Sequence, residues 1–105
     1  MAKLSKKVIQ EVKNILPEVR KEVISECKRW DKNYAGSPDL YSEESILNIL
    51  PYAAYEYIIL AWDIEPCRID RDSAIRALNG KRFKDIRKVT AHAMRRIACN
   101  YAIRK

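Results

Sequence analysis

A run of basic side chains near the C-terminal end is the part of this sequence best suited to chemistry, and that chemistry is the binding of phosphate groups. Residues 68–105 carry twelve Lys or Arg against three Asp or Glu, a net charge of +9. Segregated positive charge of this kind is typical of a surface that meets a polyanion. The candidate nucleic-acid-binding residues in this region are Lys81, Arg82, Lys84, Arg87, Lys88, His92, Arg95 and Arg96.

The rest of the chain has a different charge balance. Residues 31–67 have a net charge of −6 and residues 1–30 one of +4, which brings the whole chain to +7. Lys3, Lys6, Lys7 and Lys13 extend the basic footprint if the first helix packs beside the last. We expect the acidic middle to cap helices and to pair with the basic ends of its own chain. The alternative is pairing with a second copy, which leaves a homodimer open.

Catalytic chemistry is not indicated. His92 is the single histidine and lies in no recognisable nucleophile motif, while the two glycines, 44 residues apart, form no phosphate loop. A zinc site from Cys27, Cys67, His92 and Cys99 is disfavoured. His92 and Cys99 lie about 10 Å apart along one helix, whereas ligands of one tetrahedral zinc lie within about 4 Å of each other. We expect no enzyme, no cofactor and no metal.

The cysteines and the hydropathy pattern indicate a cytoplasmic protein. Three widely spaced cysteines and no secretory signal are typical of reduced thiols. The most apolar stretch, 46–62, is interrupted by Asn48, Pro51 and Glu56, and is too short and too polar to cross a bilayer. No membrane association is expected.

The elements that must position the basic residues are helices. Apolar residues recur at helical spacing in almost every segment, which predicts an all-α, compact helical bundle of about five helices in a single domain, 1–105. Residues 31–42 form the clearest loop. Pro17 starts a second helix or kinks a continuous one. Ser42 and Asp70 are predicted N-caps, and Gly80 is expected to end a helix in the left-handed conformation.

Residues 70–79, the turn at Gly80 and a last helix over about 84–103 resemble the outline of a helix-turn-helix unit. Arg76 departs from that outline, because a small residue usually stands there. The last helix is two-faced, and its apolar side consists of Ile86, Val89, Ala93, Met94, Ile97 and Tyr101. If bases are read directly, Arg87, His92 and Thr90 or Ala91 are the residues expected to approach them.

Tyr52, Tyr55 and Tyr57 admit two interpretations. Aromatic side chains can form a platform on which bases stack. The favoured interpretation is a core role, with the hydroxyl groups reaching the rim.

These observations predict a small basic nucleic-acid-binding protein, a DNA-binding regulator that uses the basic face of its last helix. DNA is favoured over RNA, although neutralising phosphates does not by itself distinguish the two. One alternative is an RNA-binding subunit. The other is a protein partner: a protein-binding inhibitor or accessory subunit, for example a phage-encoded inhibitor of a host nucleic-acid enzyme or defence system.

Overall fold

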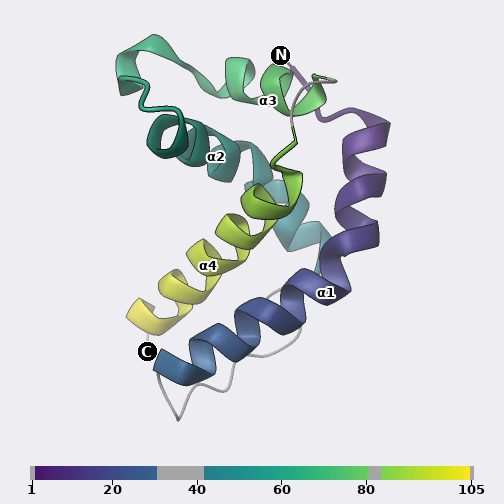
Figure 1. The fold of residues 1–105 in the computed structure, drawn as a ribbon, viewed down its shortest axis with the longest axis vertical. Helices are drawn as coiled ribbons and strands as arrows, with labels where there is room; N and C mark the ends of the chain where they lie inside the picture. Colours follow the sequence, from purple (N-terminus) through teal and green to yellow (C-terminus); the bar gives the residue numbers. More distant parts are fainter. Residues whose placement is uncertain (1, 31–41, 81–83, 105) are drawn as a thin grey trace.

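The fold is a set of packed α-helices (Figure 1). The computed structural model describes residues 2–30, 42–80 and 84–104, with the side chains of residues 30 and 99–104 left outside that description. Four α-helices and one short 3-10 turn make up the described part, which contains no strand: α1 (Lys6–Trp30), α2 (Glu43–Ala61), η2 (Pro66–Arg68), α3 (Arg71–Asn79) and α4 (Ile86–Arg104). The predicted all-α class is confirmed.

Helix α1 is one continuous helix, so the sequence-based expectation of about five helices becomes four. Pro17 lies inside it, where a proline removes one backbone hydrogen bond and bends a helix. The ribbon changes direction midway along α1 (Figure 1). One unbroken apolar stripe spans the bend, formed by Val8, Val12, Leu16, Val19 and Val23. Burial of this stripe on both sides of the proline explains why the helix bends instead of ending.

The predicted caps of α2 and α3 are confirmed. The side chain of Ser42 accepts a hydrogen bond from the backbone N–H of Ser45, and that of Asp70 accepts one from Ser73. The expectation for Gly80 is wrong, since its φ of −71° is not left-handed. A Cβ atom at Gly80 would lie 3.2 Å from the Ala77 carbonyl oxygen, so a side chain there would require that carbonyl to shift slightly.

Helix α4 occupies the centre of the packing. It packs against α1 on one side and α2 on the other, and α3 covers α2, which gives the order α1, α4, α2, α3 (Figure 1). Met94 and Val89 of α4 are fully buried, as are Leu50 and Ile58 of α2. Thr90 is a polar residue in this core, and its buried hydroxyl is satisfied because it donates to the Ile86 carbonyl oxygen at 2.8 Å.

A helix-turn-helix arrangement is not confirmed. In such a unit the two helices pack against each other and the second presents its outer face to the groove. Here α3 packs chiefly on α2, whereas α4 packs between α1 and α2. Both helices bury their apolar faces against the large apolar surface of α2. As a result, α3 and α4 are consecutive in the sequence but do not pack together as one unit.

Candidate nucleic-acid interface

The solvent-facing side of α4 is a narrow ridge. Lys88 and Arg95, with Lys84 just before the helix, are exposed and His92 is half-buried, while Ile86, Val89, Ala93 and Met94 turn into the core. Thr90 is fully buried and Ala91 is 9% exposed. The expectation that Thr90 or Ala91 approaches a base is therefore wrong, because α1 and α2 cover both sides of the helix.

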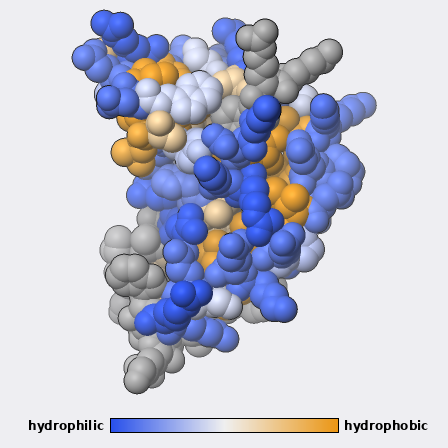
Figure 2. Space-filling model, in the orientation of Figure 1, coloured by the Kyte–Doolittle hydropathy of each residue, from blue (hydrophilic) through white to orange (hydrophobic). Residues whose placement is uncertain are grey.

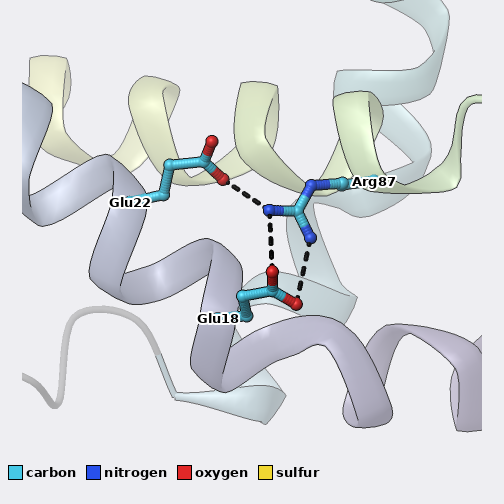
Figure 3. A network of polar contacts seen from close by, with 3 residues as sticks. All are labelled: Glu18, Glu22 and Arg87. Atoms are coloured by element: carbon cyan, nitrogen blue, oxygen red, sulfur yellow. Dashed lines mark hydrogen bonds and ion pairs between the residues drawn. The ribbon is translucent and has the colours of Figure 1, made fainter.

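Arg87 reaches across to α1 and binds two of its carboxylates (Figure 3). Its Nη2 donates to Glu22 Oε2 at 2.7 Å, and its Nη1 lies 3.3 Å from Glu18 Oε2. Hydrogen bonding to Glu18, together with the charges of both glutamates, raises the pKa of Arg87 above its ordinary value. Glu18 and Glu22 are one helical turn apart, and that spacing places both on the side facing α4.

The same arrangement recurs further along α4. Arg95 Nε donates to Glu26 Oε2 at 2.7 Å, so Glu26 continues the acidic row one more turn along α1. On the opposite flank, Glu56 of α2 faces two partners. Its Oε1 lies 3.3 Å from His92 Nε2 and 3.2 Å from Arg96 Nε.

The charge around α4 is therefore largely compensated by the protein itself. Arg87, Arg95, Arg96 and His92 lie against carboxylates of α1 and α2. Among the described candidates, Lys84 and Lys88 have no ion pair with any described carboxylate. Lys81 and Arg82 lie outside the described residues. The eight candidates thus divide into four paired residues, two unpaired lysines and two whose placement is not described.

Asn79 holds the start of the chain against the end of α3. The side chain of Asn79, at the end of α3, binds the segment that leads into α1. Its Oδ1 accepts from the Ser5 backbone N–H and its Nδ2 donates to the Lys3 carbonyl oxygen, both at 2.8 Å. This contact brings Lys3 and Ser5 to the C-terminal end of α3.

We name this region the basic end and define it by its exposed cations: Lys3, Lys6, Lys7, Arg76, Lys84 and Lys88. None of them forms an ion pair with a carboxylate in the part of the chain that the structure describes. The lysines of α1 were expected to extend the footprint. Arg76 was not among the candidates predicted from sequence, and its only signal was a large cation where a helix-turn-helix has a small residue.

The three tyrosines of α2 take different roles. The Tyr57 hydroxyl donates to Asp85 Oδ2 at 2.9 Å and links α2 to the start of α4. Tyr52 is 44% exposed, which does not fit the core role favoured from sequence. Its ring stacks on that of Tyr55, with the centroids 6.5 Å apart.

Nowhere in residues 2–30, 42–80 and 84–98 do three or more His, Cys, Asp or Glu side chains gather in a way that could hold a metal ion. Across the same part of the chain, no helix combines the length and the apolar character needed to cross a membrane. No protein-family model, curated protein or solved structure matches this chain.

Proposed function

We propose that this protein binds nucleic acid by neutralising backbone phosphates with its basic end. The observation that carries the proposal is the division of its cations into two classes. Arg87, Arg95 and Arg96 of α4 are held by Glu18, Glu22, Glu26 and Glu56. The cations of the basic end lack such partners among the described residues, so a polyphosphate chain can relieve their mutual repulsion.

The contacts are expected to be independent of sequence. Lysine ammonium groups are compact point charges that bind phosphate without selecting a base. Helix α4 packs against α1 and α2 on two sides, so the exposed cations Lys88 and Arg95, with Lys84 just before the helix, are among those it can present to a ligand. Phosphate contact at one end of the bundle is therefore the mode that this packing favours, and duplex DNA is the first ligand to test.

A protein partner is the second candidate, and exposed apolar side chains near the end of α2 favour it. Leu60 is 75% exposed and Trp62 is 49% exposed. Apolar residues also reach the surface beside the α2–α3 connection, at the upper left of Figure 2. An inhibitor or accessory subunit would bind its partner through this apolar patch, whether or not the basic end also contacts that partner.

Fluorescence anisotropy over a salt series tests the proposal. The probes are a duplex of random sequence, a single strand and a structured RNA of similar length. Six phosphate contacts give a slope of about −5 in log K against log salt, with a dissociation constant of about 1–100 μM at physiological salt. A slope near zero for all three probes, with a partner recovered by pull-down through Leu60 and Trp62, would replace the proposal with the second candidate.

A further inference from the structure

A groove of about 350 Å³ lies between α2 and the start of α3. Its lining consists of Tyr52, Tyr55, Ile69, Asp70 and Arg71. This volume is at the lower end of the range of about 300–1,000 Å³ found for small-molecule sites. The groove therefore has room for one flat ring system instead of a whole helix.

Aromatic rings form one side of this groove. Tyr52 and Tyr55 are one helical turn apart, and their ring planes differ by 27°. The Tyr55 hydroxyl donates to the Pro66 carbonyl oxygen at 3.4 Å, which connects it to the segment leading into α3. Tyr52 keeps 44% of its surface exposed although it sits on the most apolar helix of the protein. An exposed aromatic ring that a neighbouring ring holds in place is a surface on which another flat ring can stack.

Two cations lie at or near this groove, and one of them, Arg71, lines it. The guanidinium carbon of Arg96 lies 5.5 Å from the Tyr52 ring centroid, within cation–π range. Tyr52 lines the groove, whereas Arg96 does not. Arg71 lines the groove, is exposed and makes no ion pair with a described carboxylate. The Asp70 carboxylate also lines the groove and keeps its negative charge, because the hydrogen bond from the Ser73 backbone N–H at 2.7 Å and the start of α3 stabilise the ionised form.

We infer that this groove stacks an unpaired nucleobase on Tyr52 while Arg71 contacts the adjoining phosphate. The inference rests on the proposed function and adds a class of ligand to it, single-stranded nucleic acid. Bases in a duplex are already paired and stacked, so the groove discriminates in favour of single strands. Stacking is tolerant of sequence because every base has a π-face. The groove therefore supplies a preference for strandedness that the lysines of the basic end do not supply.

The test compares the wild type with Tyr52→Leu and Tyr52→Phe. The probes are a fluorescein-labelled single strand of about 12 nucleotides, within the site sizes of single-strand binders, and the corresponding duplex. Leucine removes the ring and keeps an apolar side chain, so single-strand affinity should fall about 5- to 150-fold. Phenylalanine keeps the ring and should retain wild-type affinity. Duplex affinity should be the same for all three proteins.

Each outcome has one meaning. Equal single-strand affinity for wild type and Tyr52→Leu overturns the inference, as does an equal loss for single strand and duplex. Duplex binding that depends on Lys84 and Lys88 but ignores Tyr52 leaves the proposed function standing and overturns the groove alone. Absence of salt-dependent binding to either probe overturns both. Thermal unfolding of each variant checks that the fold is intact, which the exposure of Tyr52 leads us to expect.

Discussion

Asn79 ties the two ends of the fold together, and its replacement by alanine is the sharpest test of the packing. Its amide oxygen accepts from the Ser5 N–H and its amide nitrogen donates to the Lys3 carbonyl oxygen, at 2.8 Å each. Ser5 also starts α1, because its side-chain oxygen accepts from the Val8 N–H at 3.2 Å. Asn79→Ala removes both links and leaves the first turn of α1 attached only through the helix.

The magnitude follows from the two bonds. A hydrogen bond contributes about 0.5–1.5 kcal/mol net to stability. Both lie in partly exposed positions where water can replace the lost partner, so the free energy of unfolding should fall by about 1–2 kcal/mol in total. In a domain of this size that loss lowers the Tm by about 5–15 °C.

Thermal unfolding followed by circular dichroism measures this shift, and hydrogen exchange of the N-terminal peptide locates it. Asn48→Ala is the matched control, since it makes the same substitution at an exposed position of α2. Exchange of the Ser5 amide should accelerate in Asn79→Ala and remain unchanged in Asn48→Ala. Equal melting temperatures and equal exchange for the two variants would refute the assignment of Asn79 as the tie between α3 and α1.

Three further predictions concern the core residue Leu50, the Tyr57 hydroxyl and the Asp70 helix cap. Leu50→Ala, at a fully buried site, should cost about 2–5 kcal/mol in urea unfolding, whereas Leu60→Ala on the same helix, at a site 75% exposed, should change stability by less than about 0.5 kcal/mol. Burial, then hydrogen bonding to Asp85, raises the pKa of Tyr57 above 10.0, so its contribution is present below about pH 10 and is lost as the pH rises through the raised value. The stability advantage of wild type over Tyr57→Phe should therefore shrink above pH 10, and a constant advantage would contradict this linkage. The backbone hydrogen bond from the capped turn lowers the pKa of Asp70 below 3.8, so the advantage of wild type over Asp70→Ala should be present at neutral pH and decline below about pH 3.8; an advantage independent of pH would contradict the cap.

Much of the fold could be predicted from local signals. Ser42 and Asp70 cap the helices they were expected to cap, because an oxygen placed one residue before a helix satisfies an otherwise unpaired N–H. The start of the last helix was also located within two residues. The local sequence could not show whether Pro17 kinks one helix or separates two, because the packing of α1 on both sides of the bend decides this.

The charge pattern was informative about location and misleading about exposure. The basic residues of α4 were predicted to form a binding face, and their pairing with the glutamates of α1 was not predicted. Glu18 and Arg87 are 69 residues apart in the sequence, and only the tertiary packing of α1 on α4 brings them together. A helical wheel shows which residues share a face of one helix, but not which other helix covers that face. For the same reason, the exposure of Tyr52 could not be predicted from a helix that is apolar on nearly every side.

The most direct test of the central claim is a comparison of salt slopes for two double variants binding the same duplex. Lys84→Gln/Lys88→Gln removes cations that have no ion pair with a described carboxylate, and Arg87→Gln/Arg95→Gln removes cations held by Glu22 and Glu26. Each phosphate contact contributes about 0.9 to the slope, so the lysine variant should lose about 1.8 and the arginine variant should keep the wild-type slope. A loss confined to the arginine variant would contradict the account, and so would equal losses in both.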